Sequence, residues 1–121
     1  MGLRIDTVTI DARDPQSLAR WWAEALAYDV VEEEPDEIAV CPPGGAAGTT
    51  LLFVDSADAK TVKNRLHIDL NPDDQRAEVE RLMALGARRA DIGQGDVPWV
   101  VLADPEGNEF CVLRPHASLT E

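Results

Sequence analysis

Apolar and polar positions alternate along residues 64–70, whose sequence is NRLHIDL. Read with a period of two, this pattern predicts a strand with Leu66 on one face and with His67 and Asp69 on the other. Polar side chains rarely share one face of a buried strand without a function or a partner. Three interpretations of this pair stay open: a metal ligand, an acid-base pair, or polar groups that line a pocket or are satisfied inside the fold.

The first part of the chain has a strand-helix-strand pattern over residues 4–31. Asp14 and Pro15 predict a helix start, because a carboxylate accepts the free N–H groups of the first turn and proline has none to leave unpaired. The buried face of this helix is predicted from helical spacing at Leu18, Trp22, Ala25 and Leu26. Short strands are predicted at 29–35, 36–42 and 49–55.

The same order of elements recurs after the polar connecting segment 55–64. Asn71 and Pro72 predict a second helix start, and Gly86 stands where a left-handed residue would end that helix. Val79, Leu82 and Met83 are its predicted buried residues. Strands are predicted to follow at 87–92, 97–103 and 109–114.

Alignment of the two halves indicates an internal duplication. At an offset of 60, Thr7 aligns with His67 and Thr9 with Asp69. At an offset of 59, Leu52 aligns with Cys111. The sequence thus predicts the same arrangement of elements twice, with functional positions at equivalent places in each copy.

The predicted fold is α+β, with one domain over residues 1–121 that contains two βαβββ modules, 1–56 and 64–116. Side by side, the modules would form a cupped mixed sheet with the helices outside, and His67 and Asp69 would point into the cup. A ferredoxin-like pair with a different strand order is the alternative fold.

Composition narrows the function classes. The length of 121 residues and the 45% hydrophobic content suit one domain with a proper core. A net charge of -12 argues against nucleic acid and membrane surfaces as partners. The chain shows no signal peptide and no apolar run of about 20 residues, so we expect a cytoplasmic protein. Cys41 and Cys111 lack any disulfide pattern and are expected to be reduced thiols.

Several stretches together resemble a known family. These are IDTVTIDARDPQSLARWWAEALAYDV, RLHIDL, LMALGA and WVVLADPEGNEFCVL, of which DPEGNEFCVL is the most specific. They resemble the vicinal oxygen chelate superfamily, in its glyoxalase-like, bleomycin-resistance-like branch. The resemblance covers essentially the whole chain and implies paired βαβββ modules, a cupped sheet and a homodimer.

Metal-using relatives hold a divalent ion at four positions, which the resemblance matches here to Thr7, Leu52, His67 and Cys111. Only His67 is a conventional ligand for a hard divalent ion, while Leu52 offers no donor and Cys111 suits a softer metal. We therefore expect no resident metal or other cofactor. The remaining metal alternative is zinc on His67 and Cys111 together with an Asp or Glu.

The expected function is binding of a small organic ligand in the cup, as in a resistance or sequestering protein. The ligand-binding residues are predicted to be Thr7, Thr9, Leu52, His67, Asp69, Trp99 and Cys111. The first alternative is a lyase or isomerase in which His67 is the general base and Asp69 orients it. A metal-dependent member with altered ligands and a purely structural dimeric module are the others.

Overall fold

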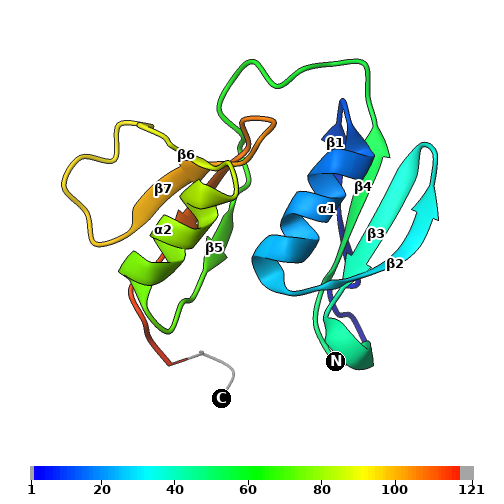
Figure 1. Cartoon of the computed structure of the whole chain (residues 1–121), viewed down its shortest axis with the longest axis horizontal. Helices are drawn as coiled ribbons and strands as arrows, with labels where there is room; N and C mark the ends of the chain where they lie inside the picture. Colours follow the sequence, from blue (N-terminus) through cyan, green and yellow to red (C-terminus); the bar gives the residue numbers. More distant parts are fainter. Residues whose placement is uncertain (1, 118–121) are drawn as a thin grey trace. The chain divides into compact units, whose positions relative to one another are not determined.

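The computed structural model describes residues 2–117 and divides the chain into two compact units, Met1–Ala59 and Lys60–Glu121. Each unit has a four-stranded sheet, with strand order β1-β4-β3-β2 in the first and β5-β8-β7-β6 in the second (Figure 1). In both sheets the first and last strands of the unit pair in parallel, and the other pairs are antiparallel. The predicted α+β fold of two βαβββ modules is confirmed. That the two units share one domain and one cup stays a prediction.

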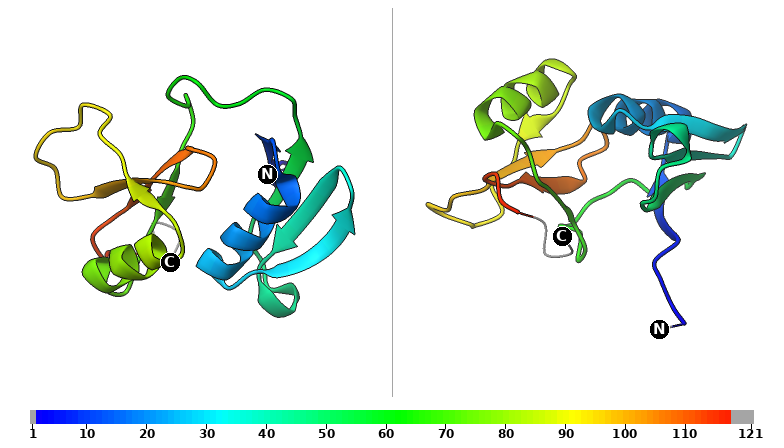
Figure 2. Two further views of the ribbon diagram at one scale, coloured as in Figure 1. Left: turned by 45° about the horizontal axis from the view of Figure 1, so that its top comes forward. Right: turned by 90° about the horizontal axis from the view of Figure 1, so that it is seen from below.

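The elements occur in the same order in both units. Those of the first unit are β1 (Thr7–Ala12), α1 (Pro15–Leu26), β2 (Asp29–Glu34), β3 (Glu37–Cys41), a single 3-10 turn (Pro43–Gly45) and β4 (Thr50–Asp55). Those of the second are β5 (Ile68–Leu70), α2 (Gln75–Ala84), β6 (Arg88–Arg89), β7 (Val100–Ala103) and β8 (Glu109–Val112). In each unit the helix lies against one face of its own sheet (Figure 2).

Each helix begins at an aspartate. The Asp14 carboxylate accepts a hydrogen bond from the Ser17 amide at 3.2 Å, with Pro15 in the first turn as predicted. In the second unit the cap is Asp74, which accepts from the Ala77 amide at 3.1 Å. The prediction of Asn71 as this cap is wrong, because the Asn71 side chain is hydrogen-bonded to the backbone of His116 instead.

The core of each unit lies between its helix and its sheet. Leu18 and Trp22 of α1 are almost fully buried, as are Ile38 and Phe53 of the sheet beneath them. In the second unit Leu82, Leu102 and Phe110 play the same part. Met83 was predicted to face inward but is 40% exposed, so the buried face of α2 is narrower than its apolar residues indicate.

The strands of the second unit are shorter than the sequence predicts. Pairing with β8 begins only at Ile68, so His67 precedes the strand, and Leu66 is 85% exposed. The cause is the segment before it, where Asn64 is hydrogen-bonded to the side chains of Asn108 and Glu109 and is thereby held out of the strand ladder.

The strand β2 forms one edge of the first sheet. All six of its residues are exposed, three of them are consecutive glutamates at 32–34, and the register shifts between Val30 and Glu32. Within residues 2–117, neither helix has the length and apolarity needed to cross a membrane.

The two helices end at equivalent positions with different residues, which gives a stability prediction. Ala27 has φ 55° and Gly86 has φ 118°, and only glycine adopts such angles without steric cost. We expect Ala27→Gly to raise the free energy of unfolding by about 1 kcal/mol and Gly86→Ala to lower it by a similar amount. Denaturant titration measures both. A destabilised Ala27→Gly variant would contradict the argument.

Candidate functional site

Three polar side chains meet on one face of the second sheet. The parallel register of β5 and β8 places Asp69 directly beside Cys111, although 42 positions separate them in the chain. His67 lies two residues before Asp69, and its imidazole Nε2 is 3.1 Å from the Asp69 carboxylate. We call His67, Asp69 and Cys111 the Asp69 cluster. Their ligand atoms all lie within 4.8 Å of one another.

Asp69 is the centre of this cluster. It accepts a hydrogen bond from the Cys111 thiol and contacts the His67 ring. The side chains of His67 and Asp69 are 36% and 49% exposed, whereas Cys111 is only 3% exposed. Both side chains are thus partly buried, and Asp69 is bonded to the neighbouring strand, so the predicted alternative of satisfied polar groups stays open beside a binding role. A buried thiol and an open imidazole share one carboxylate.

The thiol of Cys111 is held in its protonated form. Burial raises its pKa to about 11, and the negative charge and hydrogen bond of Asp69 act in the same direction, while Lys63 opposes them. At neutral pH Cys111 is thus a hydrogen-bond donor to Asp69. It is not poised as a nucleophile or as a donor to a developing oxyanion.

One imidazole nitrogen of His67 is not engaged by Asp69. When Nε2 carries the ring proton, it donates to Asp69, and Nδ1 is left as an acceptor. A carboxylate that fixes the tautomer of an exposed imidazole is the arrangement needed to accept a proton or a hydrogen bond from a bound molecule. The predicted pairing of His67 with Asp69 is therefore present in the geometry.

The family resemblance raises the question of a metal. One nitrogen, one carboxylate oxygen and one sulfur within 4.8 Å fit three ligands of a zinc-type ion, whereas a hard ion such as Mg²⁺ prefers oxygen ligands. The equivalent positions of the first unit add little, because Leu52 has no donor and the Thr7 hydroxyl donates to Asp6 at 2.7 Å. If zinc were bound, the Asp69 cluster would hold it, and the ion would supply a Lewis acid.

The predicted site residues of the first unit occupy the matching backbone positions. Thr9 pairs with Leu52 in the parallel register of β1 and β4, as Asp69 pairs with Cys111 in the second unit. Thr7 is the next residue on the same face of β1. That Thr7, Thr9 and Leu52 contact the same ligand as the second unit stays a prediction.

Of the three tryptophans, Trp99 is the accessible one. It is 38% exposed, whereas Trp21 and Trp22 are buried and pack edge to face with ring centroids 5.1 Å apart. Trp99 immediately precedes β7, and Val101 on that strand pairs with Cys111. Because side chains alternate along a strand, Trp99 and Val101 lie on the face that carries the Asp69 cluster.

An ion pair next to the cluster was not predicted from the sequence. Lys60 Nζ lies 2.6 Å from Glu109, and both side chains are mostly buried, at 17% and 12% exposure. Burial alone would raise the pKa of Glu109, but hydrogen bonds from Lys60 and from the Asn64 amide outweigh it and lower that pKa. Glu109 lies two residues before Cys111 on β8, so both side chains are on the same face of the strand. That spacing was the only sequence signal for a charged group beside the cluster.

Comparison with known proteins places the chain in a family. A profile described as "Glyoxalase-like domain" matches residues 7–113, so the protein belongs to the glyoxalase-like domain family. A search of curated proteins found no match. The predicted membership in a glyoxalase-like family is thereby confirmed.

Several solved structures share the fold. TnmS3, an antibiotic binding protein from Streptomyces sp. CB03234, is 22% identical, with 96% of this chain and 99% of that chain covered and a TM-score of 0.69. A glyoxalase/bleomycin resistance protein/dioxygenase family enzyme from Burkholderia phytofirmans PsJN is 16% identical over 92% and 98%, with a TM-score of 0.71. A bleomycin resistance determinant encoded on the transposon Tn5 is 16% identical over 95% and 100%, with a TM-score of 0.62. At these identities the likeness shows the fold alone.

The thiol pKa predicts a pH dependence. In the unfolded chain Cys111 ionises near its ordinary pKa of 9.0, but in the folded protein only near about 11. Its contribution to stability is therefore complete below pH 9 and is lost as the pH rises to 11, by about 2 kcal/mol. Denaturant titrations between pH 9 and 11 should show a smaller loss of unfolding free energy for Cys111→Ala than for the parent protein. Cys41→Ala is the control and should keep the full loss.

The Lys60–Glu109 pair gives a second prediction. Lys60→Met leaves a mostly buried carboxylate without its partner and should lower the free energy of unfolding at pH 7 by about 2 kcal/mol. Because the pKa of Glu109 is lowered, its contribution is present above its ordinary value of 4.5 and disappears as the pH falls below it.

The stability difference between the parent protein and Glu109→Gln should accordingly shrink from pH 6 to pH 3. Glu80→Gln is the control, because the exposed Arg76–Glu80 pair should contribute less than about 0.5 kcal/mol. A larger effect at Glu80 than at Glu109 would refute the assignment.

Proposed function

We propose that this protein binds a small organic ligand without a resident metal, on the face of the second sheet that carries the Asp69 cluster. The observation that carries the proposal is how the polar groups of the cluster are paired with one another. Asp69 accepts from the Cys111 thiol and contacts His67 Nε2, so the other imidazole nitrogen can accept a hydrogen bond from a ligand. An exposed indole on the same face, Trp99, adds an apolar surface for that ligand.

The role of the binding is proposed to be resistance or sequestration. The support is the family and the printed descriptions of fold neighbours, one an antibiotic binding protein and another a bleomycin resistance determinant. A sequestering protein needs affinity and no turnover, and a Cys111 thiol that stays protonated at neutral pH suits that requirement.

We propose further that the protein is a cytoplasmic homodimer. Cys41 and Cys111 are both free thiols, as expected in a reducing compartment. The dimer follows from the family resemblance, and light scattering of the purified protein measures it directly.

A lyase or isomerase is the second candidate function, favoured by the 3.1 Å contact between His67 and Asp69. In that reaction His67 Nδ1 would take a proton from the substrate, and Asp69 would stabilise the imidazolium that forms. Binding and catalysis can be separated, because only catalysis requires the ring to exchange its proton during turnover.

A ligand screen tests the proposal. Protein purified without chelator is first analysed for metals and then screened by thermal shift against small aromatic and 2-oxo compounds. We expect substoichiometric metal and at least one stabilising compound, whose affinity falls about tenfold in His67→Ala because a charge-assisted or neutral hydrogen bond is lost. Lys63→Met is a matched control for a nearby change of charge.

Two outcomes would replace the proposal. A stoichiometric metal that is lost in both His67→Ala and Cys111→Ala would make the protein a metal-dependent member. Consumption of the bound compound, abolished in His67→Ala while binding persists, would make it an enzyme. If no compound stabilises the protein and His67→Ala changes only stability, the ligand-binding proposal fails.

A further inference from the structure

The chain arches away from β8 just before β5 begins. Ile68 lies beside Phe110 in the parallel register, so continued pairing would place position 64 beside position 106. Instead the Asn64 amide donates to the Glu109 carboxylate at 3.0 Å, and the chain bends at positions 65 and 66. We call residues 64–67 the His67 arch.

The His67 arch is fixed at both of its ends. At the first end, Asn64 also donates from its side chain to the side-chain oxygen of Asn108 at 2.8 Å. At the second end, Ile68 enters the ladder of hydrogen bonds between β5 and β8. Only residues 65–67 lie between these two fixed points, so the backbone that carries the imidazole has little conformational freedom.

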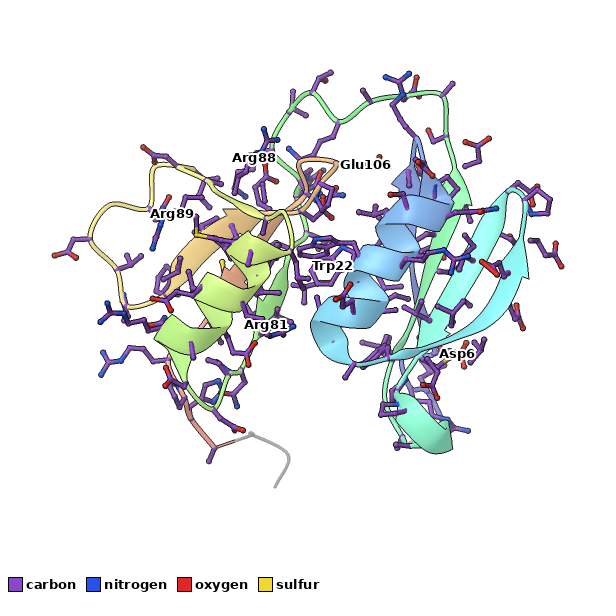
Figure 3. All side chains as sticks on the ribbon, viewed as in Figure 1. Asp6, Trp22, Arg81, Arg88, Arg89 and Glu106 are labelled. Atoms are coloured by element: carbon purple, nitrogen blue, oxygen red, sulfur yellow. The ribbon has the colours of Figure 1, made fainter. Side chains whose placement is uncertain are left out.

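The turn between β7 and β8 fixes Asn108 in its own place. The Asn108 side-chain amide donates to the two carboxylate oxygens of Asp104, at 3.2 and 3.0 Å. The same carboxylate accepts from the backbone amides of Glu106 and Asn108, each at 2.9 Å, and Asp104 is only 1% exposed. Figure 3 shows this turn, marked by Glu106, next to the connecting segment. The arch is therefore bonded to a rigid, buried turn.

Apolar packing does not hold the His67 arch in place. Leu66 within the arch is 85% exposed, and Val62 just before it is 75% exposed. Full burial of a leucine side chain contributes about 1.5–3 kcal/mol, and an exposed leucine contributes little of that. The position of the arch thus depends on the polar bonds made at Asn64.

Both carboxylate oxygens of Glu109 are engaged. One accepts from the Asn64 amide at 3.0 Å, and the other accepts from Lys60 Nζ at 2.6 Å. The charge of Lys60 compensates that of Glu109, which lies on the sheet face of the Asp69 cluster. This leaves Asp69 as the carboxylate that contacts the His67 ring.

We propose that Glu109 and Asn64 are positioning residues for His67. They fix the start of the arch, and the arch places imidazole Nε2 3.1 Å from the Asp69 carboxylate. With Nε2 donating to Asp69, Nδ1 is the nitrogen offered to a ligand. This inference rests on the proposed function, in which His67 bonds the ligand, and it assigns the residues that set the geometry of that bond.

The test measures the ring nitrogens of His67 by NMR, without any ligand. The full-length protein is labelled with ring-15N histidine and studied at pH 8, and His116→Gln assigns the two histidines. In the parent protein we expect a protonated Nε2 and an unprotonated Nδ1, with well-separated 15N shifts. The urea-unfolded protein gives the separation for a ring without fixed partners.

Loss of the Glu109 carboxylate should release the arch. In Glu109→Ala the separation of the two 15N shifts should move at least about half of the way to the unfolded value, because both bonds to the carboxylate are lost. Glu109→Gln keeps one acceptor oxygen and should move less. Asn64→Ala keeps its amide bond and should also move less. These two milder variants carry the test if Glu109→Ala does not fold.

Two controls separate positioning from a general loss of stability. Val79→Ala removes a buried contact of α2 in the same unit and should lower the free energy of unfolding without moving the His67 signals. Asp69→Ala alone should move these signals to the unfolded value. Adding Glu109→Ala to Asp69→Ala should then have no further effect, because Glu109 acts through the contact between His67 and Asp69.

Three NMR results would overturn the inference: unchanged His67 signals in Glu109→Ala, an equal change in Val79→Ala, or independent effects of Asp69→Ala and Glu109→Ala.

The consequence for binding is measured with the compound that gives the largest thermal shift with the parent protein. Its affinity should fall about fivefold in Glu109→Ala and should not fall further when Glu109→Ala is added to His67→Ala. An equal loss in the His67→Ala background would also overturn the inference. Absence of any stabilising compound overturns the proposed function, whereas the NMR spectra still decide whether Glu109 and Asn64 position His67.

Discussion

The constraint on which the candidate site depends is the parallel pairing of the first and last strands within a βαβββ unit. This pairing brings Asp69 beside Cys111 from distant parts of the sequence, and the chain before β5 then carries His67 up to the same carboxylate. The same strand register buries the Cys111 thiol, which keeps it protonated, and leaves the His67 imidazole partly exposed. A shift of β5 by one residue would turn Asp69 to the helix side and remove the whole cluster.

The duplicated units show how one backbone can carry two chemistries. The register pair Thr9 and Leu52 stands in the first unit where Asp69 and Cys111 stand in the second. A hydroxyl beside a hydrocarbon offers little to a cation or a proton, so the titratable chemistry is confined to one copy. The strand order is the same in both units although these residues differ, so the arrangement of strands does not require the Asp69 cluster.

Much of this was predictable from local patterns, because helix starts, apolar periodicity and the offset between halves are encoded within short windows. Asp14 with Pro15, and the alignment of His67 with Thr7, needed no knowledge of distant contacts. The Lys60–Glu109 pair, the true cap at Asp74 and the displacement of His67 from the strand depend on residues brought together only by folding. The loop of residues 90–99 likewise takes its shape from side-chain hydrogen bonds that periodicity does not encode, such as those made by Gln94.

The outer strand of the first sheet has a consequence for the behaviour of the protein at high concentration. An unpaired strand edge can recruit another chain and so begin the growth of fibrils. Here that edge carries consecutive carboxylates at 32–34 and a break in its pairing pattern after Val30. Repulsion between like charges and an irregular backbone both oppose pairing of β2 with a strand of another molecule. The sequence of β2 thus disfavours aggregation through this edge.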